Sequence, residues 1–452
     1  MWWSFSKYAL CDETGTETTI TNRNRRQPML DLRLIREQPE FVKAEIAKLN
    51  TTAPIDEIVA LDERRRSMLT EVETLKAQLN AGSRETGKKA AGEERDAHIG
   101  AMRALGDEIA QLDAAAGEVD RELHAILLTV PNLPSPDAPV GKDESENVIT
   151  ETWGEQRRFD FMPRPHWEVM EQLGIIDFER GVKVSGSRFY FLKGQGARLQ
   201  RALITWMLDL RLEQGYEEIY PPYIVREEAL VGTGNLPKFA DTLFKDREEG
   251  MWMIPTAEVP VTNMYRDEII DGAQLPINHC AFSACFRNEK ASAGRDVRGI
   301  KRGFQFDKIE MVKFVAPENS AAEHARLIAD AAETLRRLEI PFRHLEICTG
   351  DLSFVAARKV DLEAWAPGSE EWLEVSSCSN FHDFQARRAN IRFRPSEGAR
   401  VQFVHTLNGS GLGLPRTLAA VIENNQQEDG SVVIPPILRS YMGGIDRIAP
   451  PA

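Results

Sequence analysis

The sequence of 452 residues has few cysteines and no long hydrophobic run. Its cysteines number five, they include no C-x-x-C pair, and Cys280 and Cys285 are separated by four residues. An odd set with these spacings argues against a disulfide framework and against a thiolate zinc site. The longest apolar stretch, ALITWMLDL at residues 202–210, contains an aspartate and is far shorter than the ~20 residues of a membrane span. We therefore expect neither zinc nor a transmembrane segment.

Basic residues are fewer than acidic residues in this sequence. Lysine and arginine number 56 against 70 aspartates and glutamates, which gives a formal net charge of −14. Any contact with nucleic acid must then come from local basic patches and not from a global field. The 42% hydrophobic and 28% charged content is typical of a globular protein with two or three domains.

The first 28 residues lack the marks of a targeting segment. No cationic stretch followed by an apolar run is present, and Asp12, Glu13 and Glu17 are foreign to a transit peptide. We expect residues 1–28 to be a disordered polar extension. A cytoplasmic location follows by default.

Residues 29–130 have a helical pattern. Apolar residues from Ile58 to Leu79 recur in steps of three and four, with Arg65 inside the series, and a second such seam runs from Ile99 to Ile126. The Gly-rich segment near residue 87 separates the two seams. Two antiparallel helices joined at a tip, a coiled-coil arm, fit this pattern best.

The arm has two readings. A solvated coiled-coil face used for dimerisation or scaffolding is the simpler one, because acidic residues are plentiful there. Cations spaced along a rod also suit the phosphates of an RNA helix, which is recognised mostly by shape. The cations that gather along the first helix and the tip are Arg64, Arg65, Arg66, Lys76, Arg84, Lys88, Lys89 and Arg95.

Residues 131–150 are rich in proline and end acidic, which is typical of an extended linker. Residues 151–452 mix strand and helix patterns, and short turns or long loops join the strands more often than single crossover helices do. This predicts an α+β domain with a mainly antiparallel sheet. No G-x-G-x-x-G or P-loop motif occurs. The predicted strands are Arg188–Leu192, Glu218–Val225, Ala281–Cys285, Gly303–Phe306, Ile309–Phe314, His344–Cys348, Asp361–Ala364, Trp372–Ser376 and Ile391–Phe393, and the predicted helices are Gly196–Gln214 and Ala321–Leu338.

The stretch richest in chemistry is CFRNEKASAGRDVRGIKRGFQFDKIEM, residues 285–311. A guanidinium such as that of Arg287 binds a phosphate or carboxylate bidentately, Glu289 can accept from an adenine amino group, and Phe306 offers a stacking face. Together these describe an ATP site on a sheet. Taken singly, Arg287 and Glu289 also suit a cross-strand ion pair, and Phe306 suits a core.

This stretch resembles motif 2 of class II aminoacyl-tRNA synthetases, in the version found in the seryl-tRNA synthetase family. Three further stretches agree in the same order along the chain. The stretch IPTAEVPVTN (254–263) resembles the Thr-x-Glu element, EVSSCSN (374–380) running into DFQARRANIRF resembles the ATP-side segment, and TLNGSGLGLPRTL (406–418) resembles motif 3. The arm stands where that family has its tRNA-binding arm, so the resemblance covers about Met29 to Met442.

The resemblance implies a function. A class II sheet flanked by helices would ligate L-serine to its tRNA through a seryl-adenylate, with ATP and Mg²⁺, in a homodimer, and could also serylate selenocysteine tRNA. Two alternatives stay open. One is a serine-activating paralogue that serves biosynthesis or antibiotic resistance, and the other is a non-catalytic RNA-binding paralogue.

The resemblance also implies roles for individual residues, with Arg287 and Arg416 as the catalytic pair. Lys290, Ala291 and Phe304 depart from the family pattern, which has Ala, Gly and His there, and the lost glycines restrict the loop backbone. The implied sets are Thr256, Ala257, Glu258, Arg287, Glu310 and Ser410 for serine; Arg287, Asn288, Glu289, Phe306, Glu374, Val375, Ser376, Ser377 and Arg416 for ATP; Glu374 and Ser377 for Mg²⁺; and Arg64, Arg65, Lys76, Arg84, Lys88 and Lys89 for tRNA.

Overall fold

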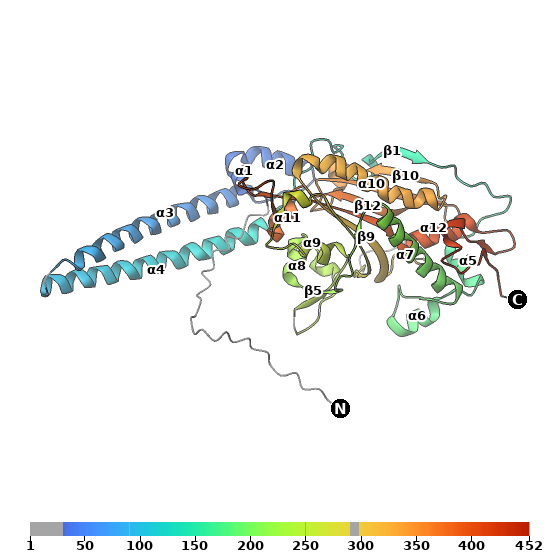
Figure 1. Ribbon diagram of the computed structural model, residues 1–452, viewed down its shortest axis with the longest axis horizontal. Coiled ribbons are helices and arrows are strands. Elements are labelled where there is room, and N and C mark those ends of the chain that lie inside the picture. Colours follow the sequence, from blue (N-terminus) through green and yellow to red (C-terminus); the bar gives the residue numbers. More distant parts are fainter. Residues whose placement is uncertain (1–29, 90, 249, 290–297, 452) are drawn as a thin grey trace, which may run out of the picture.

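The computed structural model describes residues 30–451, apart from residues 90, 249 and 290–297. The expected polar extension, residues 1–28, and the departures at Lys290 and Ala291 lie outside the described residues. A long two-helix arm projects from a body built on one large sheet (Figure 1). No helix in the described part of the chain has the length and apolarity that crossing a membrane requires.

The arm has the predicted antiparallel form, with two short helices packed at its base (Figure 1). Its seam is confirmed, because Ile58 and Val72 on one helix and Ile109 and Val119 on the other are buried. Arg65, the one charged residue in the seam, pairs across it with Asp120, so a hydrophobic contact is replaced there by an ion pair of 2.8 Å. The helices are α1 (Leu32–Glu37), α2 (Pro39–Ala47), α3 (Ile55–Thr86) and α4 (Glu93–Leu127).

The body is organised by an eight-stranded sheet. Every neighbouring pair of strands is antiparallel except β4 and β8, which are parallel. The predicted α+β class with a mainly antiparallel sheet is confirmed. In spatial order the strands are β1 (Val148–Trp153), β10 (Phe342–Glu346), β11 (Arg358–Ala366), β12 (Glu371–Asn380), β15 (His405–Gly413), β9 (Gln305–Val315), β8 (Ile277–Phe286) and β4 (Glu217–Glu218).

Some predicted strands differ from the observed ones. The strand predicted over Glu218–Val225 is wrong: β4 ends at Glu218, and β5 (Ile224–Arg226) pairs with β6 (Met251–Met253) in another sheet. Pro221 and Pro222 lie between them and have no N–H to donate, so a continuous ladder cannot pass. The two strands predicted within 303–314 are one strand, β9.

The remaining elements surround the large sheet. Helices α7, α10 and α12 pack on one face, and α9 and α11 lie on the other. The helices are α5 (His166–Gln172), α6 (Phe178–Ser185), α7 (Gln195–Glu213), α8 (Glu227–Gly232), α9 (Glu258–Asn263), α10 (Ser320–Arg337), α11 (Phe384–Ala389) and α12 (Leu414–Asn425). The short strands are β2 (Ile176–Asp177), β3 (Phe191–Leu192), β7 (Ile269–Asp271), β13 (Arg392–Arg394), β14 (Gln402–Phe403), β16 (Val432–Val433) and β17 (Arg447–Ile448).

Strand β9 illustrates how the sheet separates core from site. Ile309 and Met311 belong to the main hydrophobic core with α7, α10 and α12. Lys308 and Glu310 alternate with them and therefore face the opposite side, on which α9 and α11 lie. Lys308 and Glu310 therefore lie on the face of the sheet away from the main core.

Short polar contacts fasten the arm to the body. The Asn132 amide donates to the backbone oxygens of Val355 and Phe381, at 2.9 and 2.8 Å. Arg388 of α11 donates to the backbone oxygen of Leu128, just beyond α4, at 3.0 Å. The end of the arm is therefore bonded directly to α11 and to two other segments of the body.

Candidate active site

A cavity of about 420 Å³ opens on the polar face of the sheet, over β9, β12 and β15. Three residues assigned to the site do not line it. Ala257 and Glu310 are fully buried, and the backbone N–H of Asn288 donates to the backbone oxygen of Thr242 at 2.8 Å. The structure brings together, as lining residues, Thr256, Glu258, Arg287, Glu289, Phe306, Glu374, Val375, Ser376, Ser377, Ser410 and Arg416.

One end of the cavity is acidic. Thr256 Oγ1 donates to Glu310 Oε2 at 2.8 Å, and Glu258, at the start of α9, lies beside them. Asn408 on β15 donates its Nδ2 to both acids, at 2.8 Å from Glu258 Oε2 and 3.1 Å from Glu310 Oε1. Lys308 forms an ion pair with Glu310. These contacts hold two carboxylates side by side with little freedom to move.

Glu258 is unusually basic for a carboxylate. Burial is the main cause that raises the pKa of Glu258 to about 7, and the nearby charge of Glu310 is the second. The hydrogen bond from Gln385 lowers the pKa but does not offset these two effects. That bond joins Gln385 Nε2 to Glu258 Oε1 at 2.6 Å. A buried carboxylate of this kind has much to gain from a cationic ligand, because the ligand's charge favours ionisation.

The other end of the cavity is basic and aromatic. Arg287, which follows β8, has its guanidinium carbon 5.2 Å from the centre of the Phe306 ring. Its Nε donates to the Pro255 backbone oxygen at 3.3 Å, and its side chain lines the cavity. Glu289 pairs with Arg302 at 3.7 Å.

Arg416, in the first turn of α12, is held by two elements. Its Nε donates to the Lys301 backbone oxygen at 3.3 Å, and its Nη1 donates to the Glu374 backbone oxygen at 2.7 Å. The Glu374 carboxylate lies 3.4 Å from the same nitrogen. The surrounding protein disfavours the charge of Glu374, but the positive charges of Arg416, Lys359 and Arg287 outweigh this and lower its pKa. Glu374 is therefore ionised at neutral pH.

Oxygen ligands for a hard cation occur beside Arg416. Glu374 and Ser377 lie on β12, and Ser377 is opposite Asp361 on β11. Asp361 Oδ1 is buried and has no hydrogen-bond partner among the described residues. Carboxylate and hydroxyl oxygens of this kind fit Mg²⁺, which keeps several waters and takes the rest of its ligands from few protein groups and from phosphates. Within the described residues, no group of three or more His, Cys, Asp or Glu side chains is placed to hold a metal.

Sequence reasoning missed several residues that build the site. Asn408 and Lys308 were given no role, and neither was Gln385. A usable signal was present, because Asn408 and Lys308 lie two positions from Ser410 and Glu310, and alternate residues of a strand share a face. Phe304, a departure from the family pattern, packs edge-on against Phe189 and Phe244 at centroid distances of 5.8 and 6.3 Å.

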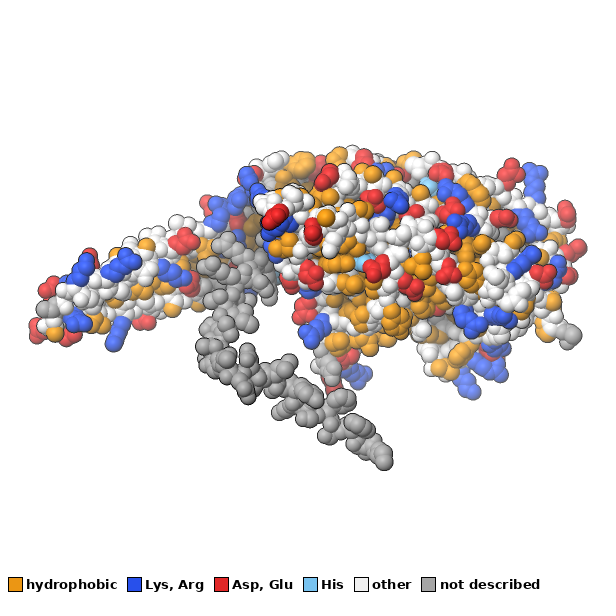
Figure 2. All heavy atoms as spheres, viewed as in Figure 1, with side chains coloured by type: hydrophobic (Ala, Val, Ile, Leu, Met, Phe, Trp, Pro, Cys, Tyr) orange, Lys and Arg blue, Asp and Glu red, His pale blue; other side chains and the backbone are white. Residues whose placement is uncertain are grey.

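The cations assigned to tRNA fall into two groups. Arg65, Lys76 and Lys89 pair with acidic residues, at 2.8, 2.7 and 2.8 Å. Positive and negative side chains are interspersed along the arm (Figure 2). The second group is exposed and has no ion pair among the residues that the structure describes; its members are Arg64, Arg84 and Lys88.

Comparison with known families agrees with this geometry. Residues 242–425 match the model for the tRNA synthetase class II core domain (G, H, P, S and T). The sheet and the cavity on it are therefore the core of a class II aminoacyl-tRNA synthetase. Residues 29–134, which hold the arm, match the model for the seryl-tRNA synthetase N-terminal domain.

Comparison with individual proteins shows to which family of class II synthetases the chain belongs. The chain is 65% identical to the serine–tRNA ligase of Thermomicrobium roseum over 93% of this chain and 95% of that protein, and 60% identical to that of Roseiflexus sp. over 93% and 99%. It resembles the crystal structure of seryl-tRNA synthetase from Pyrococcus horikoshii complexed with ATP (TM-score 0.88, 39% identity, 94% and 100% of the two chains). A cytoplasmic serine–tRNA ligase from Naegleria fowleri in complex with AMP gives a TM-score of 0.83 at 29% identity, covering 94% and 99%. The chain belongs to the seryl-tRNA synthetase family, whose members are serine–tRNA ligases.

Proposed function

We propose that the cavity joins L-serine to ATP as seryl-adenylate and then transfers the seryl group to serine tRNA. The observation that supports this most is the polarity of the cavity, which has Glu258 at one end, with Glu310 buried beside it, and Arg287 and Arg416 at the other. An acidic end suits the ammonium and hydroxyl groups of serine. A basic end suits the triphosphate of ATP.

The acidic end accounts for the choice of amino acid. Glu258, with a raised pKa, gains its charge partner when the serine ammonium binds. Glu310 and Thr256 form a buried polar pair that the serine hydroxyl can join through Ser410. Alanine would leave buried acceptors without a donor. A site built to bind a hydroxyl discriminates by up to ~10⁴-fold against a substrate that lacks it. Threonine is refused by lack of room for one methyl group, which is a weaker barrier.

The basic end accounts for the chemistry. In the first step a serine carboxylate oxygen attacks the α-phosphorus, an oxygen–phosphorus bond forms and pyrophosphate leaves. The serine carboxylate is already ionised, so no general base is needed, and catalysis consists of positioning and neutralisation of charge. Arg287 binds the α-phosphate and the serine carboxylate, Glu289 accepts from the adenine amino group, and Phe306 stacks on adenine. Arg416 lies against the other face of adenine and the γ-phosphate.

Mg²⁺ bound by Glu374 and Ser377 would shield the phosphate oxygens from the incoming carboxylate. Asp361, opposite Ser377 on β11, would add a further carboxylate close to that ion. In the second step the terminal ribose hydroxyl of tRNA attacks the seryl carbonyl, and AMP leaves.

The arm is the proposed tRNA-binding element. Arg64, Arg84 and Lys88 can meet phosphates without first breaking an ion pair, whereas Arg65, Lys76 and Lys89 must exchange one partner for another. Recognition by shape along such a rod extends to selenocysteine tRNA where an organism has one. Deleting residues 65–123 should spare adenylate formation and raise the KM for tRNA; equal loss of both activities would show that the arm is needed for folding.

A homodimer is the proposed assembly. Strand β4 is an edge strand of the large sheet, and the segment around it exposes apolar surface, with Tyr220 85% and Leu212 46% exposed. Sheet edges of this kind are commonly covered in native proteins. Sedimentation equilibrium of the full chain tests this: a two-chain mass is expected, and a monomer at micromolar concentration contradicts it.

Serine-dependent ATP–pyrophosphate exchange tests the activity, with alanine, threonine and glycine measured alongside and tRNA added afterwards. Exchange with serine alone, followed by charging of serine tRNA, is the expected result. Exchange without charging would point to a serine-activating paralogue. No exchange would favour a non-catalytic RNA-binding protein.

A further inference from the structure

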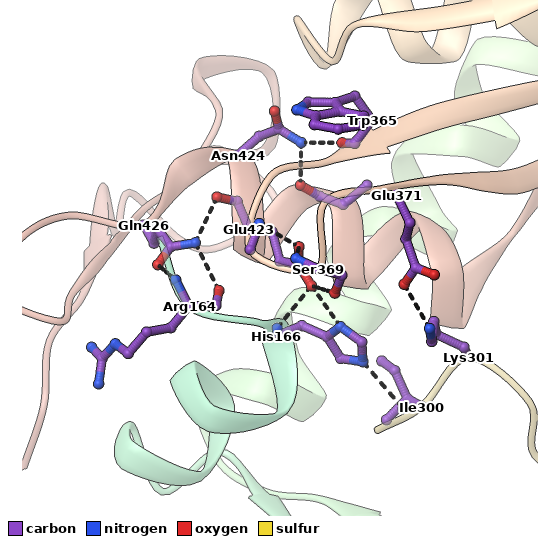
Figure 3. Close-up of polar contacts among 12 residues, drawn as sticks. Arg164, His166, Ile300, Lys301, Trp365, Ser369, Glu371, Glu423, Asn424 and Gln426 are labelled. Carbon is purple, nitrogen blue, oxygen red and sulfur yellow. Dashed lines mark hydrogen bonds and ion pairs between the residues drawn. The ribbon is translucent and has the colours of Figure 1, made fainter. Parts of the chain in front are cut away.

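A buried network outside the cavity connects four segments of the chain (Figure 3). At its centre is Glu423 of α12, which is fully buried. Its Oε1 accepts from the backbone N–H of His166 at 2.9 Å and from Ser369 Oγ at 2.7 Å. Its Oε2 accepts from the backbone N–H groups of Gly368 and Ser369, both at 2.9 Å. This carboxylate therefore ties α5 and the β11–β12 turn to α12.

His166 adds a contact that points toward the active site. Its Nδ1 lies 2.8 Å from Glu423 Oε1, and its Nε2 lies 3.3 Å from the backbone nitrogen of Ile300. Burial disfavours ionisation of Glu423, but the hydrogen bonds from His166 and Ser369 outweigh it and lower the pKa of the carboxyl. An ionised carboxylate only accepts, so Nδ1 donates to it, while Nε2 accepts from the Ile300 N–H.

The neighbouring Gly299 is fitted to the same ring. Its φ is +72°, and a Cβ at this position would lie 2.2 Å from His166 Nε2 and 3.0 Å from Trp167. The backbone at 299–300 thus lies directly on the imidazole, and only glycine permits that approach.

The next residue leads to the proposed catalytic arginine. Lys301 follows Ile300, its side chain lines the cavity and pairs with Glu371 at 2.6 Å, and its backbone oxygen accepts from Arg416 Nε. A displacement of Ile300 therefore displaces the Lys301 carbonyl that holds Arg416.

We propose that His166, oriented by Glu423, is a positioning residue that holds the backbone at Ile300 and thereby the Lys301 carbonyl that orients Arg416 for ATP. The proposal rests on the role given above to Arg416. His166 does not touch the cavity, so its effect is expected on the binding of ATP and not on the binding of serine.

Two substitutions distinguish the two hydrogen bonds of the His166 imidazole, the one to Glu423 and the one from the Ile300 N–H. In His166→Asn the amide can still donate to Glu423, but no group reaches the Ile300 N–H. In His166→Gln the longer side chain brings its Oε1 to the place of Nε2 and can accept from Ile300. Using the full-length enzyme, we expect His166→Asn to raise the KM for ATP in serine-dependent exchange about tenfold, with the KM for serine changed less than twofold. His166→Gln should restore the KM for ATP to within about threefold.

A double variant tests the connection to Arg416. If His166 acts through Arg416, His166→Asn combined with Arg416→Ala should weaken ATP binding no more than Arg416→Ala does alone. An additive loss overturns the proposal, and so does an unchanged KM for ATP in a normally folded His166→Asn. If Arg416→Ala itself leaves the KM for ATP unchanged, the role proposed for Arg416 is wrong. That result is distinct from the outcomes above, which test whether His166 positions Arg416.

Glycine variants keep the test decisive should the buried histidine variants unfold. Gly299→Ala pushes a methyl group into the ring, whereas Gly398→Ala has a comparable φ of +75° and no atom within 4 Å of the added Cβ. Both carry the same backbone strain. We expect only Gly299→Ala to raise the KM for ATP, and equal behaviour of the two variants would overturn the proposal.

Discussion

Asn408 donates the same amide nitrogen to Glu258 and to Glu310, at 2.8 and 3.1 Å. Two neighbouring carboxylates repel each other when both are ionised. The shared donor lies between them and offsets part of this repulsion, while it also fixes their separation. Asn408 therefore determines the shape of the proposed serine pocket as much as the acids do.

Replacing Asn408 with alanine should weaken serine binding. We expect the KM for serine to rise about 10- to 100-fold, because both acids lose a buried hydrogen bond, while the KM for ATP stays within twofold. The measurement is a serine titration of ATP–pyrophosphate exchange. Asn425→Ala is a matched control, since the Asn425 amide donates to the backbone of Val421 in α12, and a normal KM for serine in the Asn408 variant would contradict the assignment.

The pKa of about 7 at Glu258 predicts a pH dependence of serine use. The group binds the ammonium only when it is ionised, and a raised pKa means that it is protonated below about pH 7. The kcat/KM for serine should therefore fall as the pH is lowered through 7, by up to about tenfold per pH unit. In Glu258→Gln, kcat/KM should be low and this dependence absent; a dependence that persists in the variant would assign it to another group.

Arg287 combines a charge with a flat surface against Phe306, and two substitutions separate these properties. Arg287→Ala should lower the exchange rate at least ~10²-fold, because a charge-assisted contact to both substrates is lost. Arg287→Lys keeps the charge but has no planar fork, so an intermediate loss of about tenfold is expected. Steady-state exchange measures both, with Arg394→Ala as a surface control, and a near-normal rate in Arg287→Ala would reject the site.

The two groups of arm cations should behave differently. Replacing Arg64, Arg84 and Lys88 with alanine should raise the KM for tRNA about tenfold and reduce the dependence of that KM on salt, because fewer phosphates are neutralised. Replacing the paired set of Arg65, Lys76 and Lys89 should mainly lower the free energy of unfolding, and only slightly, because exposed ion pairs contribute little to stability.

Exchange without tRNA should be unchanged in both triple variants, which separates an effect on the arm from one on the cavity. Equal effects of the two triple variants on tRNA charging would show that the ion pairs do not govern which cations are available.

The sequence predicted best where patterns are local. The seam from Ile58 to Leu79 has a helical period that needs no tertiary information, and it is confirmed by burial. The class II sheet was indicated by several motifs in order, and the fold class is confirmed. The site roles of Arg287 and Arg416 stay predictions, although both residues line one cavity.

Other features depend on contacts that the sequence does not display. The bonds of Asn408 and Gln385 to Glu258 come from strands and helices more than a hundred residues away. His166, which reads as an ordinary structural histidine, owes its interest to the distant Glu423. Strand β15 was not predicted, because glycines and polar residues have low strand propensity. It forms a strand because it pairs with β12 and β9 in the sheet.

Helix α11 has only six residues, yet it serves two parts of the molecule. Gln385 near its start donates to Glu258 in the cavity, and Arg388, one turn later, donates to the backbone just beyond the arm helix α4. The boundary between arm and body along the sequence is therefore not a mechanical boundary. One buried turn of helix therefore connects the base of the arm to Glu258, the carboxylate proposed to bind the serine ammonium.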